Sequence, residues 1–152
     1  MSLKKTIQTD IKNAMIKKDA LRVSVLRMAL AAILNKEKEK GAKAEELTDD
    51  SVLEIVSGEA KKRKDSIGQY EKGGRQDLAG REKKELEILS AYLPEQMGEE
   101  EIRKIVKEKV SKLGANGLQD MGKIMGALMA DLKNKADGAV VKKIVEEELI
   151  GN

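Results

Sequence analysis

An all-α fold is predicted from three features of this 152-residue sequence. Apolar residues recur every three or four positions in several segments, which is the spacing of one face of an α-helix. Charged residues make up 38% of the chain and hydrophobic residues 40%, a mixture typical of amphipathic helices with ion pairs on their outer faces. No alternating strand pattern or internal repeat competes with this interpretation. The sequence therefore predicts four helices followed by three.

Two helices are predicted at the N-terminal end. Four apolar residues share one helical face there: Leu3, Ile7, Ile11 and Ala14. This helix is expected to end near Lys17 and Lys18, whose charges are favourable at a helix C-terminus. Asp19 is the expected cap of a second helix, which runs from Ala20 to about Lys40. Because the second helix is apolar around much of its girth, we expect it to be central in a bundle.

A loop over residues 41–47 is expected next, followed by a long third helix capped by Thr48 or Asp49. The centre of that helix carries four consecutive basic residues, which span most of the helix circumference and cannot all face one partner. Such a run is usually a solvated surface. The secondary basic patch predicted in this region consists of Lys61, Lys62, Arg63, Lys64 and Arg75.

The third helix is expected to end at Gly73 and Gly74, and a fourth to start with a cap near Asp77. The fourth helix stops before Pro94, whose ring disfavours helical geometry in the preceding residue. This single proline is the predicted domain boundary. The predicted limits are 1–93 for an N-terminal bundle of about four helices, 94–98 for an elbow, and 99–152 for a smaller C-terminal three-helix domain.

The three C-terminal helices are predicted from their ends. The acids of residues 99–101 favour the N-terminal turn of a fifth helix, which is expected to stop at Gly114. Asp120 is the expected cap of the sixth helix, and Asp137 that of the seventh.

The segment from Gln119 to Gly138 is the part that apolar patterning explains least well. Its methionines are spaced by four residues and share one helical face: Met121, Met125 and Met129. Gly122 and Gly126 lie on an adjacent stripe, where each costs about 1 kcal/mol of helix propensity. These small residues either admit a neighbouring helix or let a polyanion or a partner backbone approach closely. Three basic residues are near this stripe: Lys123, Lys133 and Lys135.

Familiar catalytic and metal-binding patterns are missing. The chain contains no histidine, cysteine or tryptophan, which removes the commonest general base, the thiol nucleophile and the usual nitrogen and sulfur metal ligands. The glycines form no phosphate-binding or dinucleotide loop, and no segment has EF-hand spacing. We therefore expect no catalytic residue, no cofactor and no metal site.

Charge and hydropathy bear on partners and location. The net charge of +3 is too small to predict nucleic-acid binding from bulk charge, although lysines and arginines on helices can contact phosphates without reading bases. The N-terminus lacks a signal-peptide core, and no run approaches the ~18 apolar residues of a membrane span. A cytoplasmic location without membrane association is expected.

Four segments carry a resemblance to the YqeY-like family, which is similar to the C-terminal tail of the B subunit of aspartyl/glutamyl-tRNA amidotransferase. They are LRMALAAILN (26–35), KKRKDSIGQYEKGGRQDLA (61–79), ELEILSAYLPEQM (85–97) and DMGKIMGALMADLKNKADG (120–138). The resemblance implies an N-terminal helical bundle and a smaller three-helix domain, joined at Tyr92-Leu93-Pro94. Two positions depart from the family pattern: Ala130, where proline is frequent, and Asn134, where glycine is common.

The resemblance also implies a role. In the amidotransferase the tail domain is implicated in engaging the tRNA body, while the ammonia-producing and amidating sites belong to other domains. The leading hypothesis is a non-catalytic protein that binds tRNA or a tRNA-handling complex. Its expected contact residues are Gly122, Lys123, Gly126, Lys133 and Lys135. The alternatives are a protein-interaction adaptor and an accessory component of a carbon-nitrogen ligase that uses glutamine as amido-N-donor.

Overall fold

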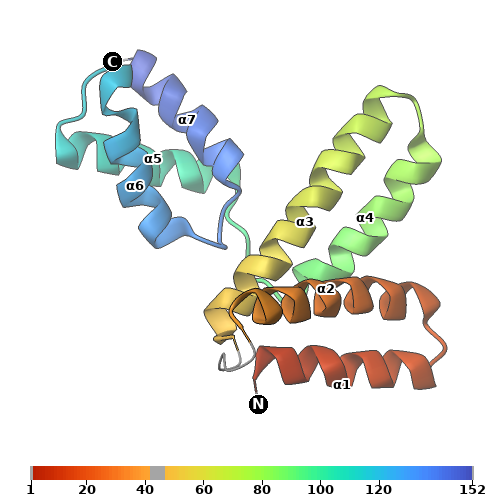
Figure 1. Ribbon diagram of the computed structural model, residues 1–152. Coiled ribbons are helices and arrows are strands. Elements are labelled where there is room, and N and C mark those ends of the chain that lie inside the picture. Colours follow the sequence, from red (N-terminus) through yellow and green to blue (C-terminus); the bar gives the residue numbers. More distant parts are fainter. Residues whose placement is uncertain (1, 42–46, 152) are drawn as a thin grey trace. The chain divides into compact units, whose positions relative to one another are not determined.

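The computed structural model describes residues 2–41 and 47–151 and confirms the all-α prediction (Figure 1). Within those ranges it contains seven α-helices and one short 3-10 helix, and no strand. Most of the loop expected over residues 41–47 lies outside the described residues. The chain divides into two compact units, Met1–Leu93 (unit 1) and Pro94–Asn152 (unit 2). The finer limits given above, with a separate elbow, stay a prediction.

Unit 1 consists of two helical hairpins, α1 with α2 and α3 with α4 (Figure 1). Its helices are α1 (Leu3–Ile16), α2 (Ala20–Glu39), α3 (Asp49–Lys72) and α4 (Gln76–Ser90). Each contributes a stripe of buried apolar residues to one core, since residues three or four apart share a helical face. The core includes Ile7, Ile11, Val25, Leu26, Ala29, Ile33, Val52, Val56, Ala60 and Leu89.

Side-chain caps start the first three helices. Asp19 accepts a hydrogen bond from the Arg22 backbone N–H at 3.1 Å, which confirms the cap of α2. Thr48 caps α3, while the neighbouring Asp49 carboxylate accepts from the Leu3 backbone N–H at 2.9 Å. The start of α1 is therefore hydrogen-bonded to the start of α3.

Asp77 is not the cap of α4, contrary to the prediction. The helix begins directly after Arg75 and has no side-chain cap. The Asp77 carboxylate instead pairs with the Arg75 guanidinium at 3.1 Å. Because Asp77 is already inside the first turn, its charge still favours the helix dipole. The helix ends at Ser90, and a turn precedes Pro94.

The expectation that α2 is central holds only on one side. The helix contacts α1, α3 and α4, but several of its apolar residues face solvent. Met28 and Leu34 are 52% and 39% exposed. The apolar residues around the circumference of α2 therefore belong to two faces, one buried in the core and one exposed to solvent.

Unit 2 packs three helices around an apolar core. They are α5 (Glu99–Leu113), α6 (Met121–Leu132) and α7 (Gly138–Ile150), with the 3-10 helix η1 (Leu118–Asp120) before α6. The core includes Ile102, Val106, Val110, Ile124, Leu128, Leu132, Val141, Ile144, Val145 and Leu149. Gly114, with a left-handed φ of 62°, ends α5 at the residue where the sequence predicts its stop.

The two predicted aspartate caps of unit 2 differ. Asp137 caps α7, because its carboxylate accepts from the Ala139 backbone N–H at 2.9 Å. Asp120 is at the N-cap position of α6, as predicted, but its side chain makes no capping hydrogen bond. Its carboxylate accepts from the Asn116 backbone N–H at 2.8 Å, because η1 leads directly into the helix and the side chain closes the preceding loop. Among the described residues, no helix is long and apolar enough to cross a membrane.

Candidate nucleic-acid interface

The methionines of α6 lie beside the most buried face of the helix and only partly within the core. The fully buried residues are Ile124, Leu128 and Leu132, which repeat every four positions. The three methionines form the next stripe and are half-buried against the same core: Met121, Met125 and Met129. The methionine stripe therefore faces the edge of the core, and the branched apolar residues form its centre.

The outer side of α6 is nearly bare. Gly122, Lys123, Gly126 and Ala130 are all exposed, and we call this surface the glycine face. A Cβ atom placed on Gly122 or Gly126 would meet no heavy atom within 4 Å outside the helix's own backbone. Among the described residues, no helix of unit 2 packs against the two glycines, contrary to the interpretation that they admit a neighbouring helix of the same domain. What the two glycines leave is helix backbone open to solvent.

The turn after α6 carries the other two predicted lysines. Lys133 and Lys135 are both exposed. Between them, Asn134 has a left-handed φ of 65°, a conformation that asparagine adopts more readily than most residues other than glycine. The turn therefore keeps a left-handed conformation even though asparagine stands where glycine is common in the family.

The segment after Pro94 holds this turn in place. The Gln96 side-chain amide donates to the backbone carbonyls of Asn134 and Pro94, both at 2.8 Å. The Met97 backbone N–H donates to the Lys135 carbonyl at 2.9 Å. Two of the motifs that carry the family resemblance, PEQM and KNKADG, therefore contact each other in unit 2.

Neither α6 and its turn nor unit 2 as a whole has an excess of positive charge, since residues 119–138 contain three lysines and three aspartates. Residues 94–152 contain ten lysines and arginines and eleven acidic residues, so unit 2 has no bulk positive charge. Lys123 lies near the start of α6 and Lys133 just after its end, about 15 Å apart along the helix axis at 1.5 Å per residue. The nearby Asp131 is paired with Lys109 at 3.8 Å. Any attraction for phosphates must come from these few lysines.

The secondary basic patch needs one correction. Lys61, Lys62 and Lys64 are exposed on α3, but Arg63 is only 5% exposed and adds no charge to the surface. The reason is its place in the helix, since it continues the stripe of buried residues Val52, Val56 and Glu59 at three- or four-residue spacing. That spacing is the signal in the sequence that would have identified it. Arg75 is exposed and paired with Asp77.

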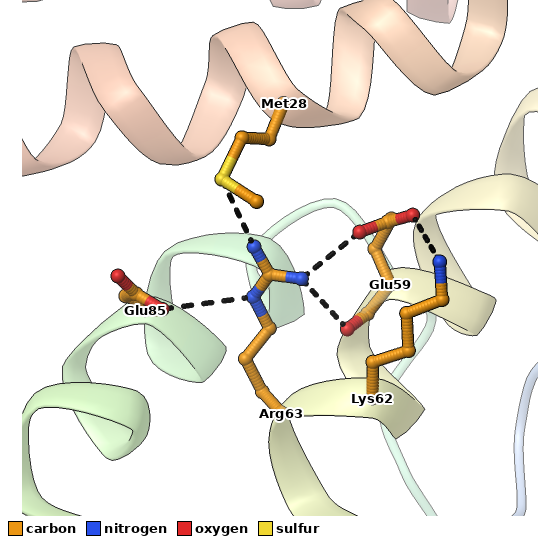
Figure 2. A network of polar contacts seen from close by, with 5 residues as sticks. All are labelled: Met28, Glu59, Lys62, Arg63 and Glu85. Carbon is orange, nitrogen blue, oxygen red and sulfur yellow. Dashed lines mark hydrogen bonds and ion pairs between the residues drawn. The ribbon is translucent and has the colours of Figure 1, made fainter. Parts of the chain in front are cut away.

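Arg63 instead joins α2, α3 and α4 through a network of polar contacts (Figure 2). Its Nη1 donates to the Glu59 carboxylate at 2.9 Å and to the Glu59 carbonyl at 3.3 Å. Its Nη2 lies 3.6 Å from the Met28 sulfur, and its Nε lies 3.8 Å from Glu85. Burial, and then the nearby Glu85 carboxylate, raise the pKa of Glu82 beside this network. The arrangement is that of an internal anchor between helices.

Within the described residues, no group of three or more acidic side chains is arranged to hold a metal ion. A hydrogen bond from the Tyr92 hydroxyl to Asp10 joins α1 to the turn after α4. Burial and this bond raise the pKa of Tyr92 above that of an ordinary phenol, so its deprotonation requires a more alkaline pH. These polar contacts hold helices together, and the exposed surface of α6 and its turn is the stronger candidate for contact with another molecule.

Comparisons with known proteins agree with this organisation. A family model described as "Yqey-like protein" matches residues 4–149. A protein of Pyrenophora tritici-repentis, named altered inheritance of mitochondria protein 41, mitochondrial, is 32% identical over 145 residues, covering 93% of this chain and 77% of its own. Proteins of the same name from Vanderwaltozyma polyspora and Lachancea thermotolerans are 41% and 39% identical, each covering 57% of this chain and 46% of its own. The chain thus spans about half the length of these two yeast relatives.

The names of these relatives correct the location expected from the sequence. The cytoplasmic assignment is wrong, because all three relatives are named as mitochondrial proteins. The apolar patterning of a helical domain carries no information about its compartment. A targeting segment is a separate stretch of chain, and about half of each yeast relative lies outside the matched region.

Proposed function

Because this chain belongs to the YqeY-like protein family, we propose that it is a non-catalytic binding protein that contacts tRNA, or a complex that handles tRNA, through the glycine face of α6. The observation that carries the proposal is the bare outer surface of that helix. A Cβ atom added to Gly122 or Gly126 would have no neighbour within 4 Å, and Lys123 lies on the same exposed surface.

Physical chemistry supports a phosphate backbone as the occupant. Helix backbone without side chains permits close approach, and lysines at both ends of α6 can contact phosphates as point charges. Structured RNA is recognised mainly through its shape and backbone, which requires no base-reading side chains. Three lysine–phosphate contacts would give a slope of log affinity against log salt of about −2 to −3.

The test is tRNA binding by the full chain, measured by filter retention at several salt concentrations. Replacing Lys123, Lys133 or Lys135 with glutamate should weaken binding and reduce the steepness of the salt slope by about one for each lysine that touches a phosphate. Lys142→Glu is the matched charge control, because Lys142 is exposed on α7 of the same unit. Absence of binding at low salt, or an equal effect of Lys142→Glu, contradicts the proposal.

A second variant tests close approach separately from charge. Gly126→Leu should reduce tRNA affinity at least tenfold while leaving the protein folded, because leucine improves helix propensity by about 1 kcal/mol and there is room for its Cβ. Gly58→Leu is the control, since Gly58 is also an exposed helical glycine with no neighbour within 4 Å. If Gly126→Leu binds tRNA normally, the glycine face is not the contact surface. Loss of a protein partner instead, with tRNA binding intact, would favour the adaptor alternative.

A further inference from the structure

The outer surface of α2 in unit 1 is a largely apolar stripe, and among the described residues no helix packs along it. At its edge, the Met28 sulfur lies 3.6 Å from Arg63 of α3. The residues of the stripe repeat at three- and four-residue spacing along one side of the helix. We call this surface the outer stripe: Ala20, Val23, Ser24, Arg27, Met28, Ala31 and Leu34. All are exposed except the half-buried Val23. From Ala20 to Leu34 the stripe extends about 21 Å, or four helical turns.

Large apolar side chains are concentrated here. Of the six large hydrophobic residues that are exposed among the described residues, four belong to the α1–α2 hairpin: Met15, Ile16, Met28 and Leu34. Single exposed apolar residues are ordinary on any protein, but a contiguous group marks an interaction surface. Methionine is especially adaptable at such surfaces, because its unbranched side chain adjusts to the shape of a partner.

The surface is hollowed as well as apolar. A groove of about 690 Å³ lies between the C-terminal end of α1 and the first half of the outer stripe. Met15 forms one side of this groove, and Ala20, Val23 and Met28 line the other. A groove beside a helix accepts the ridge of side chains on a second helix.

The charged side chains that line the groove are of one sign. The seven described residues that line it include two basic side chains, Lys18 and Arg27, and no acidic one. Asp19 is close in sequence, but its carboxylate caps α2 and pairs with Arg22 at 3.3 Å. At the other end of α2, Glu37 is paired with Lys4 at 2.9 Å. Arg27 contacts the Met15 sulfur at 3.6 Å, and because a thioether sulfur is a weak acceptor, a carboxylate of a partner can replace it.

We propose that the groove and the outer stripe of α2 bind an acidic amphipathic α-helix of a partner protein. Its apolar face would lie on Val23, Met28 and Leu34, and its flanking carboxylates would face Lys18 and Arg27. This is the helix-in-groove mode of recognition, in which apolar residues at helical spacing supply most of the contact. The site lies on unit 1 and does not depend on the tRNA-binding role proposed for α6.

Two other occupants fit less well. In a two-fold pair of this chain the same surface would be present on both sides, so the basic groove of one copy would face that of the other, which opposes association. A lipid bilayer would match the exposed Met15 and Ile16 at the end of the hairpin. It would not fill a groove along the side of α2 or use an apolar stripe four turns long.

The experiment uses the full chain and a synthetic fluorescent peptide of 18 residues that forms an amphipathic helix, with leucines on one face and glutamates on both flanks. Fluorescence anisotropy should show saturable binding. A second peptide with lysine in place of each glutamate should bind at least tenfold more weakly. Equal binding of the two peptides, or no binding of the acidic one, overturns the proposal.

Variants locate the site. Ala31→Glu places a like charge in the middle of the outer stripe and should reduce affinity for the acidic peptide at least tenfold, as should Arg27→Glu. Both positions are exposed on a helix, and the variants should fold, which circular dichroism checks. Lys36→Glu is the matched control, because Lys36 is exposed on the side of α2 away from the stripe. If Lys36→Glu reduces affinity for the peptide as much as Ala31→Glu does, bulk charge explains the binding and the assigned site is wrong.

Two further measurements identify a competing occupant. If the wild type sediments as a dimer and Ala31→Glu dissociates it, a second copy is the occupant and the proposal is overturned. The proposal is also overturned, in favour of a lipid surface, if the protein binds phosphatidylcholine–phosphatidylglycerol vesicles, Ala31→Glu abolishes that binding, and the acidic peptide does not bind. Gly126→Leu should retain full peptide affinity. Failure of the tRNA proposal is therefore distinguishable from failure of this one.

Discussion

The cores of the two units contain different kinds of contact. Among the described residues, the only buried polar or charged side chains are Glu59 and Arg63, and both are in unit 1. The buried residues of unit 2 are apolar, and its main ion pairs, from Arg103 to Glu147 and Glu148, are partly exposed at the surface. Such a surface pair contributes little to stability, whereas breaking a buried pair leaves an uncompensated charge. We infer that unit 1 depends on specific polar contacts and unit 2 on packing.

The exposed helix faces differ as well. On α6 the outer surface presents Gly122, Gly126 and Ala130, which place backbone within reach. On α2 the outer stripe presents Met28 and Leu34, which place large apolar groups in solvent. The first suits a backbone or a phosphate chain and the second suits an apolar helix. The two proposals therefore assign different kinds of partner to the two helices.

The largest expected effect comes from Arg63→Ala. Removal of the guanidinium leaves Glu59 and Glu85 nearly buried and paired with the exposed Lys62 and Arg81, and loss of the buried partner costs up to about 3–5 kcal/mol in the free energy of unfolding. Urea denaturation monitored by circular dichroism measures it. The control combines Arg63→Met with Glu59→Gln and Glu85→Gln, which removes the charges together and should recover much of the loss. A loss below about 1 kcal/mol for Arg63→Ala would refute the difference between the two cores.

The next effect concerns alkaline pH. Tyr92→Phe removes the hydrogen bond to Asp10 and should cost about 1.5 kcal/mol at pH 7, as expected for a bond to a charged acceptor. Burial and that bond raise the pKa of Tyr92, so the stabilisation is present below the ordinary phenol pKa of about 10 and is lost as the pH rises above it.

Denaturation midpoints of the wild type and Tyr92→Phe, measured between neutral and strongly alkaline pH, test this sign. The wild type should lose stability faster than the variant once the pH passes about 10. Both tyrosines of the chain, Tyr70 and Tyr92, belong to unit 1, so Tyr70→Phe is a matched control that should keep the wild-type slope. If the denaturation midpoints of the wild type and Tyr92→Phe change in parallel with pH, the protonated phenol does not stabilise the fold through its hydrogen bond.

The smallest effect compares one backbone position in each unit. Lys18 in unit 1 and Asn134 in unit 2 both have left-handed φ values, of 58° and 65°. Lysine in this conformation is strained by about 1 kcal/mol, whereas asparagine tolerates it. Lys18→Gly should therefore raise the free energy of unfolding by up to about 1 kcal/mol, and Asn134→Gly should change it by less. Thermal denaturation of both variants measures the difference, and an equal gain at the two positions would contradict the explanation.

Much of the fold could be predicted from local sequence signals. The apolar spacing predicts the helices, and short-range signals predict the Asp19 and Asp137 caps and the stop of α5 at Gly114, because each depends on residues within one turn. Asp77 and Asp120 show the limit of such signals. The start of α4 is two residues earlier than predicted, which makes Asp77 a first-turn residue. Asp120 is at the N-cap position of α6, but its carboxylate bonds to the Asn116 backbone instead of the helix.

The sequence by itself determined which residues share a helical face: the glycines of α6, the apolar residues around α2, and Arg63 with Glu59 on α3. The tertiary structure decided which of these faces are covered. Arg63 is buried because α2 and α4 pack on its side of α3. The glycine face is open because, in the part of unit 2 that the structure describes, no helix packs on it. Helical spacing is a property of a few neighbouring residues, whereas exposure depends on contacts between segments far apart in the chain.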